Sequence, residues 1–292
     1  HRDPVLAISG ATSAYHNVTL AHLNISNGGS WEIELLEGGG IQARDLRLVV
    51  RDTTLLNNTA GQHGEGGGIH LQRSAGAVSG ILELQRNVRI TGNAARNGGG
   101  IAVENASLRI RPDGTEIFGN QARIYGGGVA GLDSDITVGS FGEPETSSTA
   151  IGLVIRDNVA TQGGGGLFIV NGLLDLRETA FIDNVAAHGG GLYAQGAQVQ
   201  IGRDSMGMAV QCAGDRLCSR FEGNVAGFDC PRSNGYGGAI YLNDSRGFIR
   251  QTLFSFNCAG TGAVLTAFGS VAPQPAIDVE GIATRHNVSQ YP

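Results

Sequence analysis

A repeated pairing of an asparagine with a glycine cluster runs along most of this chain. An apolar residue is followed three positions later by asparagine, and a variable loop then leads to two or three glycines and an aliphatic residue. The seventh copy is degenerate, with Ala263-Val264 in place of the cluster and its aliphatic residue. The asparagines of the seven copies are Asn58, Asn93, Asn120, Asn158, Asn184, Asn224 and Asn257. Their spacing varies between 26 and 40 residues. A β-solenoid tolerates such variation because insertions leave the coil as loops while the strands stay in register.

Short runs of alternating apolar residues lie between the copies, for example at 46–50, 81–84, 108–110 and 173–176. Such runs are typical of β-strands. We therefore predict an all-β chain, a right-handed parallel β-helix of the pectate-lyase-like kind. It should have about eight coils, each with about three strands and two or three turns.

The glycine cluster and the asparagine of the repeat each have a structural explanation. Glycine permits positive φ and close backbone approach at a corner. An asparagine repeated at one turn tolerates the left-handed conformation and can hydrogen-bond amide to amide with its copies. The repeated asparagines are therefore predicted to stack in one column inside a turn, as part of the architecture.

One copy of the repeat resembles a known family. Phe221-Glu222-Gly223-Asn224 followed by Gly237-Gly238-Ala239-Ile240 is similar to the paired FxxN and GGA[ILV] repeats of the polymorphic outer-membrane proteins, which resemble autotransporter passengers. The resemblance extends over roughly 50–264, although most copies read GGG and several replace phenylalanine with Ile or Leu. It implies a β-helix, a location outside the cell or on the bacterial surface, and a role in adhesion. The family's C-terminal transporter domain has no counterpart in these residues, so any tether to the membrane is expected to lie in a separate domain.

The predicted domain is single and spans 1–292. Residues 1–50 are expected to form the first coils and a cap, 51–264 the repeat coils, and 265–292 a C-terminal cap, because the repeat pattern fades at both ends. Open solenoid ends are sheet edges and need covering.

Charge and hydropathy limit the partners. All 20 basic residues are arginine, which excludes lysine chemistry, and the net charge of −6 argues against a nucleic-acid partner. No apolar run approaches the roughly 20 residues that a transmembrane helix needs. No motif indicates a cofactor.

Four cysteines fall in the C-terminal third: Cys212, Cys218, Cys230 and Cys258. Three pairings are possible in principle. We predict two disulfides and an oxidising compartment, with Cys212–Cys218 and Cys230–Cys258 as the favoured pairs. Buried free thiols are the alternative, whereas a metal site is disfavoured because no C-x-x-C pair or suitably spaced histidine is present.

The residue after the inward-facing aliphatic of each copy should point outward, because alternate residues of a strand face opposite ways. Across the copies this outward column contains His70, Ala102, Ala130, Phe168, Tyr193 and Tyr241. Two residues further along the last two strands lie Gln195 and Asn243. We predict that Phe168, Tyr193 and Tyr241, with these two amides, contact a ligand, since contiguous exposed aromatics mark partner sites. The alternative is that a loop such as 141–150 or 226–236 covers them.

A second column lies four residues before each aliphatic: Glu65, Asn97, Tyr125, His188 and Tyr236. These side chains would stand at one edge of the same groove. We interpret them as ordinary solvated loop residues rather than as a site.

Asp157 and Asp183 carry the enzymatic alternative. Each precedes a repeat asparagine, in neighbouring coils, and outward-pointing copies would stack about 4.8 Å apart. Paired carboxylates serve glycoside hydrolysis, and oxygen ligands can bind calcium. One such pair is easily accidental, however, and no other repeat position concentrates catalytic groups.

These observations favour a secreted or surface-displayed binding module, adhesin-like, that contacts a glycan or a host surface protein. The alternatives are a carbohydrate-active enzyme, either a polysaccharide lyase or a glycoside hydrolase, and a structural stalk. An exposed aromatic groove would favour the first, converging acids in a deep cleft the second, and a bare polar surface the third.

Overall fold

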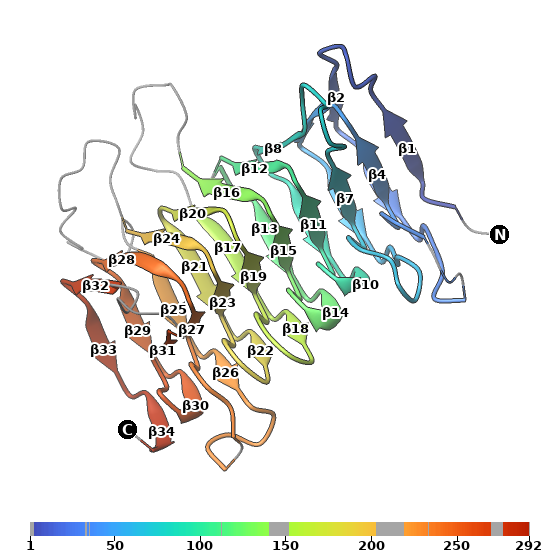
Figure 1. Cartoon of the computed structure of the whole chain (residues 1–292). Coiled ribbons are helices and arrows are strands. Elements are labelled where there is room, and N and C mark those ends of the chain that lie inside the picture. Colours follow the sequence, from blue (N-terminus) through green and yellow to red (C-terminus); the bar gives the residue numbers. More distant parts are fainter. Residues whose placement is uncertain are drawn as a thin grey trace.

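The chain winds into a right-handed parallel β-helix, as the repeat predicts (Figure 1). The computed structural model describes residues 3–32, 34, 36–111, 113–139, 152–202, 219–232, 234–269 and 277–291. Within this part of the chain every paired strand runs parallel to its neighbours, and no helix is present. Four sheets run along the axis, with nine strands in three of them and seven in the fourth. The described residues thus form nine coils with up to four strands each, more than the sequence predicts.

The first sheet, here sheet A, follows the glycine clusters. Its strands are β1 (Leu6–Ser9), β4 (Ile41–Arg44), β7 (Ile69–Gln72), β11 (Ile101–Glu104), β15 (Val129–Leu132), β19 (Leu167–Val170), β23 (Leu192–Gln195), β27 (Ile240–Asn243) and β31 (Leu265–Phe268).

Sheet B comes next along each coil. It contains β2 (Asn17–Ala21), β5 (Arg47–Arg51), β8 (Ile81–Gln85), β12 (Ser107–Ile110), β16 (Asp135–Val138), β20 (Leu173–Leu176), β24 (Gln198–Ile201), β28 (Arg246–Arg250) and β32 (Ile277–Glu280).

Sheet C carries the apolar residue that precedes each repeat asparagine. Its strands are β3 (Asn24–Ser26), β6 (Thr54–Leu56), β9 (Arg89–Thr91), β13 (Glu116–Phe118), β17 (Leu153–Arg156), β21 (Thr179–Ile182), β25 (Arg220–Glu222), β29 (Leu253–Ser255) and β33 (Ala283–Arg285).

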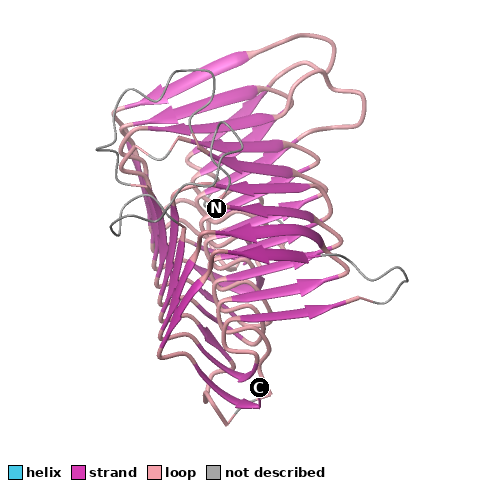
Figure 2. Cartoon of the chain, turned by 90° about the vertical axis from the view of Figure 1, so that its left-hand side faces the viewer, coloured by secondary structure: helices cyan, strands magenta, loops and turns pink. Residues whose placement is uncertain are grey.

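Sheet D is the shortest and returns the chain to the next glycine cluster. It contains β10 (Ala94–Asn97), β14 (Gln121–Tyr125), β18 (Val159–Ala160), β22 (Val185–Ala186), β26 (Val225–Ala226), β30 (Cys258–Thr261) and β34 (Val288–Tyr291). Figure 2 shows the strands of the whole chain stacked along the axis in separate sheets.

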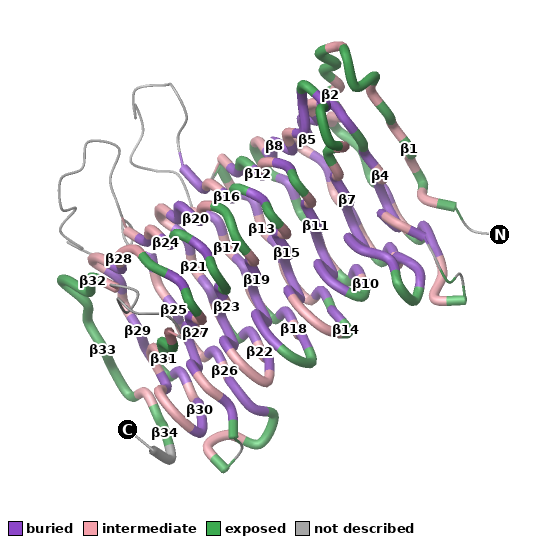
Figure 3. Tube along the Cα trace, in the orientation of Figure 1, coloured by how far each residue is buried: buried purple, intermediate pink, exposed green. Residues whose placement is uncertain are grey.

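The core is a column of mostly aliphatic side chains from sheets A, B and C, and buried segments recur from coil to coil along the chain (Figure 3). Small buried alanines of sheet D, Ala122, Ala160 and Ala186, form a separate cluster. Within sheet C the rings of Phe181, Phe221 and Phe254 stack, with centroids 4.6 and 5.4 Å apart. The ring of Phe221 lies where a Cβ on Gly191 would come within 2.9 Å of it. The third glycine of a cluster thus leaves room for the phenylalanine of the repeat.

The asparagine ladder predicted from the repeat is present between sheets C and D. In each coil the asparagine Nδ2 donates to the Oδ1 of the next asparagine, as Asn158 does to Asn184 at 3.0 Å. The same Nδ2 also donates to a backbone carbonyl, that of Ile117 at 3.0 Å. The ladder runs through all seven predicted asparagines and extends to an eighth, Asn287. Buried amides that satisfy one another and the backbone fix the register of successive coils.

The C-terminal end departs from the prediction of a cap over 265–292. Strands β32, β33 and β34 pair in register with the preceding coil, and Asn287 occupies the ladder. This segment therefore continues the solenoid. The sequence pattern fades there because Thr284 and Ser289 take the positions that Phe254 and Ala259 hold one coil earlier.

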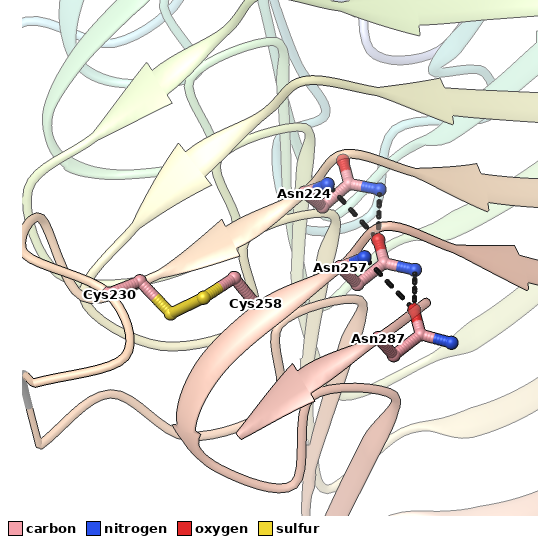
Figure 4. Close-up of a disulfide and its surroundings, with 5 residues drawn as sticks. All are labelled: Asn224, Cys230, Asn257, Cys258 and Asn287. Carbon is pink, nitrogen blue, oxygen red and sulfur yellow. Dashed lines mark hydrogen bonds between the residues drawn. A yellow bond between two sulfur atoms is a disulfide. The ribbon is translucent and has the colours of Figure 1, made fainter. Parts of the chain in front are cut away.

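A disulfide joins Cys230 to Cys258, as predicted, and links the loop before β27 to β30 (Figure 4). The same view shows the last three ladder residues, Asn224, Asn257 and Asn287, beside it. Cys212 and Cys218 lie outside the described residues, so their pairing remains a prediction.

Candidate functional site

The candidate site lies at the corner where sheet D turns into sheet A. The first glycine of each cluster there has positive φ, for example Gly164 at 63°, and starts a tight turn that brings the end of one strand against the outer face of the next. Two side-chain columns meet at this corner. The corner column contains Glu65, Asn97, Tyr125, Gly163, His188 and Tyr236. The outward column of sheet A contains His70, Ala102, Ala130, Phe168, Tyr193 and Tyr241.

Aromatic residues from the two columns, together with Phe268 in register with Asn243, interlock toward the C-terminal end of the corner. The set comprises Tyr125, Phe168, His188, Tyr193, Tyr236, Tyr241 and Phe268, and we call it the aromatic strip. Tyr125 stacks on Phe168 with centroids 4.3 Å apart. Tyr193 meets Phe168 and Tyr241 edge-on, at 5.2 and 4.7 Å. Edge-to-face and offset contacts of this kind are the favoured arrangements of aromatic pairs.

Phe168 corrects the prediction of three exposed rings. Its side chain is only 3 % exposed, because Tyr125 of the corner column covers it. Tyr193 and Tyr241 are half-buried, while Gln195 is exposed and Asn243 is partly exposed. Strand alternation does turn these rings away from the interior of the coil, but the neighbouring column rather than a partner encloses Phe168.

The corner column also differs from the solvated loop residues that the sequence predicts. Glu65 and Asn97 are buried, and Tyr125, His188 and Tyr236 are half-buried against the rings of sheet A. Where this column has a glycine, Gly163, the ring of Tyr193 fills the space, since a Cβ there would lie 2.2 Å from its Cδ1. Strand alternation predicts two separate columns, and only the geometry of the corner shows that they pack against each other.

The strip is uncharged at neutral pH. Burial raises the pKa of the Tyr193 hydroxyl to about 12, and the nearby Tyr241 and Tyr125 add to the shift. Burial also raises the pKa of Tyr241 and lowers the pKa of His188. Neutral rings with amide groups at their edge offer an apolar face and hydrogen-bonding groups side by side.

The predicted carboxylate pair occupies a different corner. Asp157 and Asp183 are exposed and have positive φ of 55° and 53°. They belong to a column in which every described residue preceding a ladder asparagine has positive φ, a conformation that Asn, Asp and Gly tolerate. This position gives both aspartates a structural role.

The electrostatics of this pair also fit a structural role. Arg156 donates to Asp157 at 2.6 Å, while burial raises the pKa of Asp183, with the carboxylates of Asp157 and Glu222 adding to the shift. The two acids are therefore close enough for the charge of Asp157 to act on Asp183. Among the described residues, no group of three or more acidic, histidine or cysteine side chains is arranged to hold a metal ion.

Comparison with known proteins agrees with the repeat. Residues 219–243, from β25 to the end of β27, match the family described as the Chlamydia polymorphic membrane protein repeat. This chain carries the polymorphic membrane protein repeat. The matched segment contains Asn224, the glycine cluster and Tyr241, so it joins a ladder residue to a residue of the aromatic strip. No curated protein and no solved structure matches the chain. No helix within the described residues is long and apolar enough to cross a membrane.

Proposed function

We propose that this chain is the passenger-like β-helix of a bacterial cell-surface protein, and that the aromatic strip is its contact with an extracellular glycan. Proteins with the polymorphic membrane protein repeat are associated with the outer membrane, which supports a surface location. The observation that carries the binding role is the run of uncharged rings from Tyr125 to Phe268, in which Tyr193 and Tyr241 are half-buried and Phe268 is exposed.

The geometry of the strip supports a glycan in particular. Sugar rings present apolar faces that pack on aromatic rings and hydroxyls that hydrogen-bond to amides. Tyr193 and Tyr241 are held in place by neighbouring rings, so little side-chain freedom is lost on binding. Gln195 and Asn243 stand on the same strands, two residues further along, where they can bond to hydroxyls.

A glycan array probed with the wild type, Tyr193→Ala and a matched control tests this proposal. Tyr193→Ala should weaken binding by about 1–2 kcal/mol, the range of an aromatic interface anchor. The control Tyr15→Ala removes a tyrosine that is 58 % exposed and far from the strip, and should bind as the wild type does. The melting temperature of each variant is measured in parallel, because Tyr193 also packs on Phe168.

Three results would overturn the proposal. They are no binding by the wild type to any glycan, equal weakening by both variants, or a lower melting temperature of Tyr193→Ala without weaker binding. Binding to a host protein but to no glycan would retain the strip as a contact surface and reject the glycan.

A further inference from the structure

The N-terminal half of the same corner replaces aromatic rings with a buried histidine between carboxylates. His70, on β7, is 3 % exposed. Its Nδ1 lies 3.5 Å from Oε2 of Glu37 and its Nε2 lies 3.7 Å from Oε1 of Glu104. Neither nitrogen has a hydrogen-bond partner among the described residues. Glu37, His70 and Glu104 come from three successive coils, so the cluster crosses the corner diagonally.

Glu65 is the most buried carboxylate of this cluster, at 7 % exposed. Its Oε1 accepts a hydrogen bond from Asn97 at 2.9 Å, and its Oε2 is buried without a partner. Its backbone N–H donates to Glu37 at 2.7 Å. Burial raises the pKa of Glu65 to about 7, with the carboxylates of Glu37 and Glu104 adding to the shift and Asn97 and His70 opposing it.

The charged groups around Glu65 are few. They are Glu37 before β4, His70 on β7, Glu104 on β11 and Arg96 on β10, whose guanidinium is 3.9 Å from the Glu65 carboxylate. Arg44 on β4 reaches Glu104 through Gln72, by hydrogen bonds of 2.8 and 3.0 Å. The proximity of His70 holds the pKa of Glu104 below its usual range. Glu104 therefore stays ionised near neutral pH and opposes the ionisation of Glu65.

Asn97 connects this cluster to the aromatic strip. Its Nδ2 donates to Glu65, and its Oδ1 accepts from the backbone N–H of Tyr125 at 3.0 Å. The register between β10 and β14 is irregular between Ala95 and Asn97, directly before this contact. Tyr125 is the residue that covers Phe168. One amide side chain thus joins the buried carboxyl to the first ring of the strip.

We propose that Glu65 is a proton-binding site that regulates the aromatic strip through Asn97 and Tyr125. With Glu65 protonated, the corner is closed and Tyr125 is held on Phe168. With Glu65 ionised, a buried charge faces two other carboxylates, and the corner relaxes by turning Glu65 outward. Asn97, whose hydrogen bond favours the ionised carboxylate, moves with Glu65 and loosens its contact with the backbone of Tyr125. The regulatory meaning rests on the proposed function of the strip. The proton-linked rearrangement itself does not need a ligand.

The linkage has a definite sign. The folded-state pKa of Glu65 lies above the ordinary carboxyl value of 4.5, so the folded protein binds the extra proton between the two values. The closed corner is therefore favoured below the ordinary value and is lost as the pH rises through about 7. Burial lowers the pKa of His188, the histidine of the strip, so its titration falls on the acid side of the Glu65 transition.

The test follows the tyrosine near-UV circular dichroism and the carboxyl ¹³C NMR signal of Glu65 in the whole chain between pH 4 and 9. The wild type should show one tyrosine transition with the same midpoint as the carboxyl signal. Glu65→Gln should abolish it, since glutamine keeps the shape and the oxygen that Asn97 contacts. Glu116→Gln, the same change on sheet C beside Arg89, should leave it unchanged. Asn97→Ala should keep the Glu65 titration and uncouple the tyrosine signal from it.

A tyrosine transition that persists in Glu65→Gln, or a Glu65 carboxyl that titrates near its ordinary value, would overturn the proposal. An Asn97→Ala variant in which the tyrosine signal still follows Glu65 would overturn the role of Asn97. These readouts use no glycan, so their failure leaves the proposed binding function standing. Absence of glycan binding would in turn leave the proton linkage intact.

Discussion

At the scale of single residues, Asn158 shows how the ladder holds neighbouring coils together. Its Oδ1 accepts from both the backbone N–H and the Nδ2 of Asn120, and its Nδ2 donates to Ile117 and Asn184. Asn158→Ala removes four hydrogen bonds, but the Nδ2 of Asn120 keeps its bond to Ile90 and the Oδ1 of Asn184 keeps the backbone N–H of residue 158. The buried backbone N–H of Asn120 loses its partner, and an unpaired group of this kind costs about 1–3 kcal/mol. We expect the free energy of unfolding, measured by urea titration, to fall by about 3 kcal/mol.

The exposed Asn17 provides the control for the ladder. Asn17→Ala should change the free energy of unfolding by no more than about 0.5 kcal/mol, as surface substitutions generally do. Equal losses in the two variants would show that the ladder has no special energetic role.

Asp183 permits a pH test of the structural reading of the aspartate pair. Because burial and the neighbouring carboxylates of Asp157 and Glu222 raise its pKa above 3.8, the folded protein holds this proton more tightly. Stability therefore declines as the pH rises above that value. Asp183→Asn, which also tolerates positive φ, should melt at a higher temperature than the wild type at pH 7 and at the same temperature at pH 3.

Asp157→Asn is the comparison, because it breaks the ion pair with Arg156 and should bring no such gain. A lower melting temperature of Asp183→Asn at pH 7 would contradict the structural reading of this pair.

The sequence predicts seven asparagines of the ladder, but it does not predict that the ladder continues to Asn287. The seven predicted asparagines follow from their pairing with glycine clusters, and they stack as expected. Asn287 follows Thr284 three positions earlier rather than an apolar residue, so the pattern of the other copies does not identify it. The sequence also does not predict that Phe168 is buried, because the ring that covers it, Tyr125, lies 43 positions earlier in the chain.

At the scale of elements, the three positions of a glycine cluster make different demands. Gly164 has φ of 63°, and a Cβ there would lie 2.3 Å from the carbonyl oxygen of Leu167. A left-handed conformation alone costs a non-glycine residue about 1–2 kcal/mol, and the clash adds to this. Gly164→Ala should therefore lower the free energy of unfolding by at least about 2 kcal/mol in urea titration.

Gly191, the third glycine of the next cluster, supplies the matched control. Alanine already occupies the corresponding position one coil later, as Ala239, in register with the same sheet. Gly191→Ala should thus cost less than Gly164→Ala. The reverse order would mean that backbone conformation is not what selects the first glycine.

The strands also show which features of the corner can be predicted from strand alternation and which cannot. Strand alternation identified which residues leave the core on β19, β23 and β27, and the structure agrees that Tyr193 and Tyr241 do so. Strand alternation does not give the angle between sheets D and A. That angle brings the corner column and the outward column into contact as one packed corner. The cluster of Glu37, Glu65, His70 and Glu104 was missed for the same reason, because its members come from different coils and different columns.

At the scale of the whole molecule, each coil contacts chiefly its two neighbours, so stability should be distributed along the axis. The Cys230–Cys258 disulfide closes a loop with a sequence separation of 28 residues near one end. In the chain-entropy account, such a closure contributes about 3 kcal/mol. In a solenoid this contribution should remain local rather than spread over all nine coils.

Hydrogen exchange of a Cys230→Ser/Cys258→Ser variant tests this distribution. Exchange should accelerate in β26, β27 and β30, which flank the disulfide, and in the exposed coil of β32 to β34. Strands β4, β7 and β11 should exchange as in the wild type, because the intervening coils separate them from the change. Uniform acceleration along the chain would show instead that the coils unfold as one cooperative unit, and would reject the local account.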